Sequence, residues 1–464
     1  MRNQLTIDII IKCTKRGKAF ATKADLENWI IMLPLKSMKE WCNLPASHLS
    51  FMNYVENATA VGYHTNADCQ THINAILAYN QKRHFDYLHS LTLKDTSELL
   101  PSMIGNPNNK EWAKFNPQLT ASNLMMHFAT SLVLGTQFSR DPDLMEHITA
   151  HVLGIEDVVN EFDRCPRFLW PILWRLSPTH RNFRSNYSTI KKKVIPEIKR
   201  RIKLLRYGDK AEGDSTMLTI FLKQALKEGL ISHVENSRSE EKDIDSLFMK
   251  TLFHIYEVWG PITPVLGAML TRCMANPEYA DALREEISDS LASHGGWDSD
   301  FLAHTPKLES FLRESLRLYA PISISVSRRL AKPLKLESMN MDLAKGTCIG
   351  IPTRCIHTDP ANYPDPMAFN PYRFYDPATK TCTPRASTAS ETFLAFSYGT
   401  GLCPGRFVGV KVCELMLAKI LLNYDVKYVS EDQEFPAIVL MENTWSWLDT
   451  DFTAHIRRRQ LGLA

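Results

Sequence analysis

One short stretch of the chain, FLAFSYGTGLCPGRFVG at residues 393–409, combines the residue types that a cofactor-binding loop needs. It places Cys403 among four glycines, directly before a helix predicted to begin near Gly405 to Arg406. The dipole and free N–H groups of a helix N-terminus stabilise a thiolate and lower its pKa. A planar cofactor over such a loop needs glycines where the backbone comes closest, and Phe396 could pack against its face. The combination favours a haem held by the cysteine.

The same glycines permit two other interpretations. In the first, Gly399, Gly401 and Gly405 form a dinucleotide-binding loop, with Asp425 about 20 residues further on to hold a ribose. Against this, Pro404 removes an N–H from the turn that would bind phosphate, and only about 40 residues remain for several further βα units. In the second, the cysteine is simply a small buried apolar residue, as free cysteines often are.

The elements that must position this loop are mainly helical. Apolar residues recur at helical spacing over 124–134, 278–291 and 307–318. Strand-like alternation is confined to 19–33, to short pieces of 330–352 and to the region near the C-terminus. No linker, repeat or composition shift divides the 464 residues. The sequence therefore predicts a single domain over residues 1–464, mainly α with small β-sheets.

Charge and cysteine spacing exclude several classes of partner and site. The chain has 54 Lys and Arg against 51 Asp and Glu, and a net charge of +3 predicts no nucleic-acid binding. Its ten cysteines include no CxxC pair, so neither a structural zinc site nor a secreted disulfide framework is expected. The apolar stretch 5–11 is shorter than the roughly 20 residues of a spanning helix. The basic stretch 191–206 is interpreted as a solvated helix face.

The cysteine loop resembles that of the cytochrome P450 family. Phe396, Gly399, Cys403 and Gly405 reproduce the family pattern of Phe, two residues, Gly, three residues, Cys, one residue and Gly. The resemblance covers most of the chain. The stretches HTDPANYPDP, ANPEYADALREEI and LAKILLNYDVKY are similar to those of fungal P450s of secondary metabolism, including enzymes that act on terpenoids.

Two further stretches, RESLRLYAP and YPDPMAFNPYRF, match the family's Glu-Arg-Arg cluster at Glu314, Arg317 and Arg373. A Glu-x-x-Arg spacing alone places two side chains on one helix face and occurs elsewhere in this chain. Breaking a buried ion pair costs about 3–5 kcal/mol, so such a cluster could fix the segment that carries the cysteine loop. We expect a structural role for these three residues.

The resemblance implies a P450 fold with haem b buried between helices. It also implies electrons from NADPH through an NADPH-cytochrome P450 reductase, a small apolar substrate and a location at the cytosol-facing surface of the endoplasmic reticulum. Relatives carry an N-terminal membrane anchor that this sequence does not show, so membrane contact without a spanning segment, or a cytosolic location, stays open. The expected function is a monooxygenase that hydroxylates or otherwise oxidises a secondary metabolite, with a terpenoid as the expected class.

One departure from the family lies inside the loop. Position 401, two residues before the cysteine, is usually Arg or His and pairs with a haem propionate, but here it is glycine. A charge-assisted hydrogen bond of about 1.5–3 kcal/mol is then missing. Arg328 is our candidate for a replacement cation, and a surface arginine is the alternative.

A second departure concerns proton delivery to bound oxygen. Counting back from Asn276 in ANPEY, Pro261 stands where relatives place a threonine that serves this purpose. Pro261 and Pro264 should kink the helix. Thr263 is near but lies about 200° around the helix from position 261, whereas Glu257 shares its face and is the better relay candidate. A buried, paired or surface glutamate without this role is the alternative. The alternative function is a haem-thiolate isomerase or dehydratase, or an inactive relative, that does not activate oxygen.

Overall fold

The computed structural model describes residues 17–23, 29–59, 63, 82–105, 111–207, 215–232, 237–298, 300–430, 432–441 and 445–459. The apolar stretch 5–11 lies outside these residues. Most of the described chain is helical, which confirms the predicted fold class. The helices are α2 (Phe51–Thr59), α5 (Lys82–Met103), α6 (Pro117–Val133), α7 (Thr136–Ser139), α8 (Pro142–Asp163), α9 (Trp170–Leu176), α10 (Pro178–Arg206), α11 (Met217–Lys227), α12 (Arg238–Ala275), α13 (Pro277–His294), α14 (Pro306–Leu318), α15 (Thr353–His357) and α16 (Arg406–Asn423).

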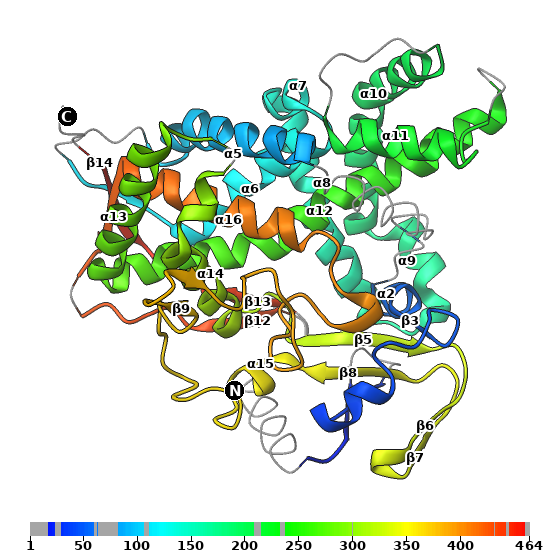
Figure 1. The fold of residues 1–464 in the computed structure, drawn as a ribbon. Helices are drawn as coiled ribbons and strands as arrows, with labels where there is room; N and C mark the ends of the chain where they lie inside the picture. Colours follow the sequence, from blue (N-terminus) through cyan, green and yellow to red (C-terminus); the bar gives the residue numbers. More distant parts are fainter. Residues whose placement is uncertain are drawn as a thin grey trace.

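The longest helix, α12, runs through the middle of the molecule (Figure 1). It packs against α6 along much of its length and also contacts α16, α13 and α14. Helix α12 continues unbroken through Pro261 and Pro264, although each proline removes one intrahelical hydrogen bond. Because α12 and α16 are in contact, the face of α12 near position 261 and the loop that leads into α16 belong to one region of the core.

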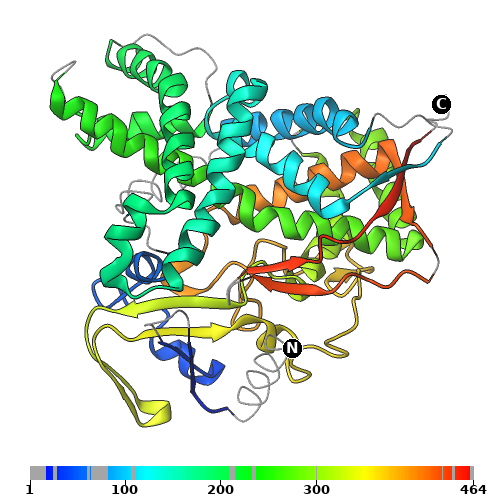
Figure 2. The same cartoon turned by 180° about the vertical axis from the view of Figure 1, so that it is seen from behind.

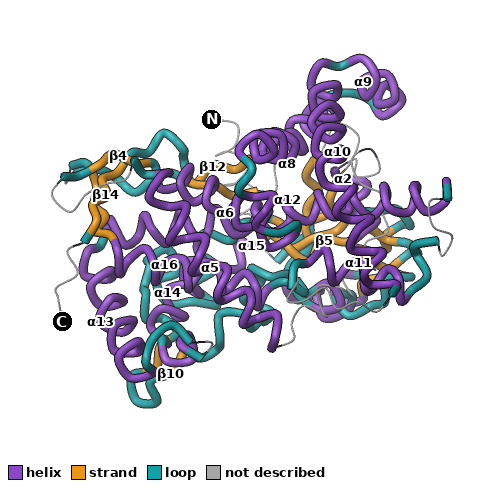
Figure 3. Tube along the Cα trace, turned by 90° about the horizontal axis from the view of Figure 1, so that it is seen from above, coloured by secondary structure: helices purple, strands orange, loops and turns teal. Residues whose placement is uncertain are grey.

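The sheets lie around the edges of the helical block. A five-stranded sheet has the order β1-β2-β8-β5-β3 and a three-stranded sheet the order β11-β14-β4; they lie toward opposite ends of the molecule (Figure 3). A β12–β13 hairpin runs beside α12 (Figure 2). The strands are β1 (Phe20–Lys23), β2 (Trp29–Met32), β3 (Leu49–Ser50), β4 (Ala113–Phe115), β5 (Ile324–Leu330), β6 (Leu334–Leu336), β7 (Met341–Leu343), β8 (Cys348–Pro352), β9 (Tyr375–Asp376), β10 (Thr381–Cys382), β11 (Tyr424–Tyr428), β12 (Ile438–Met441), β13 (Trp445–Leu448) and β14 (Ala454–Arg458).

The helices expected over 278–291 and 307–318 fall inside α13 and α14, and the one expected over 124–134 ends one residue beyond α6. Strand β5 begins six residues before the region where strands were expected. Six of its seven residues are buried, so the strand shows no alternation of apolar and polar positions. It is also irregular. Its register against β8 shifts between Ser325 and Arg328, and Val326 adopts a φ of 55°. A bulge of this kind re-aims the side chains that follow it.

The basic stretch of α10 is a helix face held by ion pairs. Val194, Ile198 and Ile202 point into the core, while Lys193 Nζ lies 2.9 Å from an Asp141 oxygen and 2.7 Å from an Asp143 oxygen. Lys193 agrees with the predicted solvated face, whereas Arg201 is only 3% exposed and its guanidinium donates to Thr216, Thr219 and the Leu134 carbonyl. Within the described residues, no helix is both long enough and apolar enough to cross a bilayer.

Candidate functional site

Cys403 lies in a tight loop between a 3₁₀ turn at Gly399–Gly401 and the start of α16. The loop is closed by the Cys403 N–H, which donates to the Phe396 carbonyl at 2.9 Å. Burial raises the pKa of the Cys403 thiol, while hydrogen bonds from the Gly405 and Arg406 N–H groups lower it. The N-terminus of α16 therefore faces the sulfur. A metal ion bound to the thiolate would offset the cost of burying its charge.

Gly399 is required for a different reason from the one that the sequence suggested. Its φ is +69°, and a Cβ at this position would lie 2.2 Å from the carbonyl oxygen of Cys42. That same carbonyl accepts a hydrogen bond from the Thr400 N–H at 3.0 Å. The glycine thus allows the segment around Cys42 to dock onto the loop, because its missing side chain makes room for the Cys42 backbone.

Gly401 makes room for Arg328. A Cβ at position 401 would lie 2.0 Å from Arg328 Nη2 and 2.4 Å from its Cζ. The guanidinium of Arg328 therefore fills the volume that the missing side chain would occupy. Arg328 follows the irregular part of β5, which directs its side chain toward the loop.

Arg328 is a buried cation with no matching anion in the described part of the chain. It is only 2% exposed, and its recorded hydrogen bonds go to carbonyls, that of Ser327 at 2.7 Å and that of Tyr398 at 3.3 Å. Burial lowers the pKa of Arg328 to about 10. A buried charge of this kind is normally paired. A haem bound at Cys403 would bring propionates that could pair with Arg328. The residues present therefore fit a haem.

Glu314, Arg317 and Arg373 come together in one ion-pair cluster. Arg317 Nε lies 2.7 Å from Glu314 Oε2, and Arg373 Nε lies 3.1 Å from the same oxygen. Arg317 also donates to the carbonyls of His357 and Pro366, each at 2.7 Å. The cluster joins α14 to the segment after α15.

His357 connects this cluster to the cysteine loop and was not singled out from the sequence. Its ring is fully buried. Nδ1 donates to the Arg317 carbonyl at 2.8 Å, and Nε2 accepts from the Leu394 N–H at 2.8 Å. Burial lowers the pKa of His357 to about 3, which keeps the ring neutral in this bridging role. Its place in the HTDP stretch is the signal that could have drawn attention to it.

The face of α12 beside the site carries Glu257, one turn before Pro261. Its charge is close enough to Cys403 to raise the pKa of that thiol further. The Glu257 carboxylate contacts His254 Nδ1 at 2.7 Å. Thr263 is turned elsewhere, since its buried hydroxyl donates to the Trp259 carbonyl at 2.7 Å. The structure therefore engages Thr263 within its own helix and pairs Glu257 with His254.

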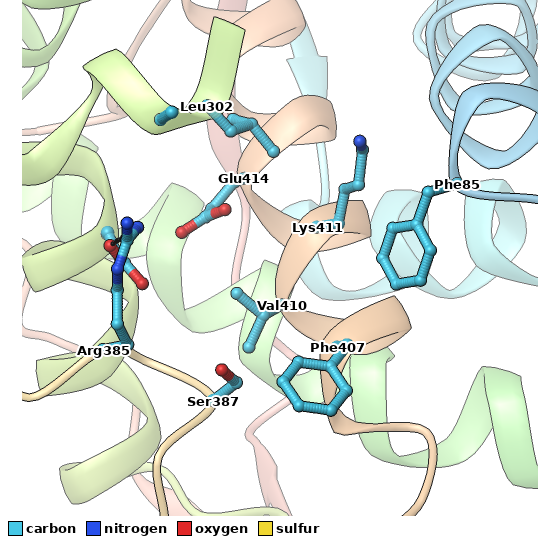
Figure 4. Close-up of a pocket in the computed structure, with 10 residues that line it drawn as sticks. Phe85, Leu302, Arg385, Ser387, Phe407, Val410, Lys411 and Glu414 are labelled. Atoms are coloured by element: carbon cyan, nitrogen blue, oxygen red, sulfur yellow. Dashed lines mark hydrogen bonds and ion pairs between the residues drawn. The ribbon is translucent and has the colours of Figure 1, made fainter. Parts of the chain in front are cut away.

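A cavity of about 240 Å³ is lined by Val410, Lys411 and Glu414 of α16 together with residues of other segments (Figure 4). Glu414 on its wall is 4% exposed. Its Oε1 has no hydrogen-bond partner within the described residues, and burial raises the pKa of this carboxyl. The neighbouring Arg385 pairs with Glu309 at 2.9 Å. This cavity is separate from the Cys403 loop.

Several known proteins similar to the chain come from fungi. The family model of cytochrome P450 matches residues 90–443. The cytochrome P450 monooxygenase cnsC of Penicillium expansum is 36% identical over 94% of this chain and 89% of its own length. The cytochrome P450 monooxygenase cpsD of Aspergillus campestris is 36% identical over 92% of this chain and 78% of its own. The bicoumarin synthase ktnC of Aspergillus niger is 34% identical over 78% of this chain and 87% of its own.

Proposed function

The chain belongs to the cytochrome P450 family and is a monooxygenase, and on that basis we propose that it oxidises an apolar secondary metabolite at a haem ligated by Cys403. The observation that carries the proposal is the cysteine at the N-terminus of α16, with N–H groups of Gly405 and Arg406 directed at its sulfur. A haem bound through this thiolate supplies the activation of dioxygen.

We assign each site residue one task. Phe396, Gly399 and Gly405 shape the loop that presents Cys403. Arg328 holds a haem propionate in place of a side chain at position 401. Glu257 holds and transfers a proton on the face of α12. The structural residues Glu314, Arg317 and Arg373 keep the loop in register with α14.

The partners and location follow from the family. Its members use haem iron and electrons from a redox partner; for this chain we propose haem b, with NADPH as the electron source through an NADPH-cytochrome P450 reductase. The chain would work as one domain over residues 1–464 at the cytosol-facing surface of the endoplasmic reticulum. A terpenoid is the first substrate class to test.

Oxidative coupling of two aromatic rings is a second candidate reaction. It is favoured by the name of the relative ktnC, a bicoumarin synthase. In hydroxylation, a substrate RH, O₂, NADPH and a proton give ROH, water and NADP⁺. In coupling, two molecules ArH with O₂, NADPH and a proton give Ar–Ar, two waters and NADP⁺. Glu257 could then accept a proton from a hydroxyl on the ring.

One experiment tests the function and separates the reactions. The ferrous carbon monoxide spectrum of the haem-loaded protein should show a strongly red-shifted Soret band that is absent in Cys403→Ala. Turnover under ¹⁸O₂, with the reductase and a panel of terpenoid and coumarin substrates, should then place one ¹⁸O in a hydroxylated product and none in a coupled one. Product formed equally well without oxygen would instead establish the isomerase or dehydratase alternative, and absence of the red-shifted band would refute the proposed haem-thiolate site.

A further inference from the structure

Glu257 and His254 are in contact on α12, and the charge of Glu257 acts on Cys403. His254, Glu257 and Pro261 follow one another at spacings of three and four residues, so they share one side of the helix. His254 Nδ1 lies 2.7 Å from Glu257 Oε2. Pro261 has no exchangeable proton. Among these three residues, the protons that can move belong to Glu257 and His254.

We propose that His254 and Glu257 form a two-residue proton relay, in which His254 is a positioning residue that returns a proton to Glu257 each time Glu257 gives one up. The inference rests on the proposed function and adds a residue to it. The proton on His254 Nδ1 moves to Glu257 Oε2 while Nε2 takes up a proton from solvent water, and the ring regains its Nδ1 proton by exchange with solvent before the next turnover. Imidazole suits this task because it can release a proton from one nitrogen while accepting one at the other.

The surroundings of the histidine fix its orientation. His254 is only 3% exposed, and its ring meets Phe221 of α11 edge to face, with centroids 5.1 Å apart and planes at 81°. Glu257 is far more open, with 44% of its side chain accessible. The pair therefore has a buried member whose ring orientation is fixed and a more exposed member whose charge acts on Cys403.

The other hydroxyl considered for this role is already engaged. Thr263 is completely buried, and its Oγ1 donates to the Trp259 carbonyl at 2.7 Å. To pass a proton toward the cofactor it would have to break this bond and turn around the helix. Glu257 and His254 need no such rearrangement.

The decisive variants are His254→Gln, His254→Ala and Glu257→Gln. Glutamine at 254 keeps an N–H that can bond to Glu257 but cannot exchange protons as imidazole does. We expect His254→Gln and Glu257→Gln each to lower the product formed per NADPH by about tenfold or more, with the lost electrons recovered as hydrogen peroxide. The double variant should fall no further, because both residues act in one path.

His147→Gln is the matched control. His147 is a partly buried histidine on α8 whose Nδ1 lies 2.9 Å from Asn186 Oδ1, so its loss should leave the coupling of NADPH to product unchanged. A His254→Gln variant that couples like the unmodified protein, beside a His254→Ala variant that does not, would overturn the relay, because a hydrogen bond alone would then account for the role of His254.

A second measurement does not depend on turnover. In haem-free protein labelled with ¹⁵N-histidine, the signals that disappear in His254→Gln identify this ring, and they should shift in Glu257→Gln. Unshifted signals would refute the pairing itself. Failure of the proposed function is distinguished by the unmodified protein, which would then lack the red-shifted carbon monoxide band or oxygen-dependent product whatever the histidine signals show.

Discussion

The position of the Arg328 guanidinium beside Gly401 predicts an effect of Arg328 on haem affinity. If Arg328 supplies the cation that position 401 lacks, Arg328→Ala removes one charge-assisted hydrogen bond, worth about 1.5–3 kcal/mol. Since about 1.4 kcal/mol corresponds to a tenfold change, the haem dissociation constant should rise about 10- to 150-fold. Titration of haem-free protein with haem, followed at the Soret band, measures this constant.

The haem-free protein should respond differently to the same change. Burial lowers the pKa of Arg328 from 12.5 to about 10, which corresponds to a cost of about 3 kcal/mol for keeping the unpaired charge inside the protein. Its two carbonyl hydrogen bonds return about 1 kcal/mol each. Arg328→Ala should therefore leave the urea stability of haem-free protein within about 1–2 kcal/mol of the unmodified value, after allowance for the lost packing of the side-chain stem. If Arg328 were purely structural, Arg328→Ala would instead lower the urea stability of the haem-free protein and leave the haem dissociation constant unchanged.

Swapping the two positions supplies the strictest test. Gly401→Arg alone should weaken haem binding, because its Cβ would lie 2.0 Å from Arg328 Nη2. Gly401→Arg combined with Arg328→Ala frees that volume and returns a cation to the loop, so the haem dissociation constant should recover to within about tenfold of the unmodified protein. The reasoning is refuted if Arg328→Ala binds haem as tightly as the unmodified protein, or if the double variant binds no better than Arg328→Ala.

Three further predictions concern stability. Burial lowers the folded-state pKa of His357 from 6.5 to about 3. The stability that comes from keeping this ring neutral is therefore fully present above pH 6.5 and is lost as the pH falls. In urea unfolding, the unmodified protein should lose about 2.5 kcal/mol more stability between pH 7 and pH 4.5 than His357→Gln does. Burial raises the pKa of Glu414, so the folded protein keeps the proton on this carboxyl to a higher pH than the unfolded chain and loses stability as the pH rises above 4.5. The stability of Glu414→Gln relative to the unmodified protein should therefore increase from pH 5 to pH 8. A difference that stays constant over this range would contradict the prediction. Gly399→Ala should cost at least about 1–3 kcal/mol in thermal unfolding, since its Cβ would meet the Cys42 carbonyl at 2.2 Å, whereas Gly409→Ala, whose Cβ would meet Ile262 at 3.8 Å, is the control that should change stability far less.

The sequence was most informative where chemistry is local. The start of α16 and the helices around 124–134, 278–291 and 307–318 were predictable because periodicity and glycine or proline positions act within a few residues. The start of β5 was missed, since a strand buried on both faces has no alternating pattern. The role of His357 was also missed, because its two partners are 40 and 37 residues away along the chain.

The site residues show the same limit at closer range. Arg328 could be named as a replacement cation from charge and order along the chain, but the sharing of one volume with Gly401 depends on the irregular register of β5. His254 was overlooked because a histidine three residues before a glutamate is a common spacing on helices. Only the burial of its ring against Phe221 and the position of Glu257 near Cys403 distinguish this pair from an ordinary surface contact.

The two departures from the family pattern have different physical consequences. At position 401 the Arg328 guanidinium occupies the volume of the missing side chain, so under the proposed role of Arg328 the cation reaches the loop from another segment. At position 261 the lost hydroxyl has no such replacement, since proline fills the position and Thr263 is bonded to Trp259. An acid one turn earlier must then act from a different point on the helix. Haem binding should thus tolerate glycine at position 401. Proton delivery should depend on Glu257 and His254, and so should the choice between hydroxylation and coupling.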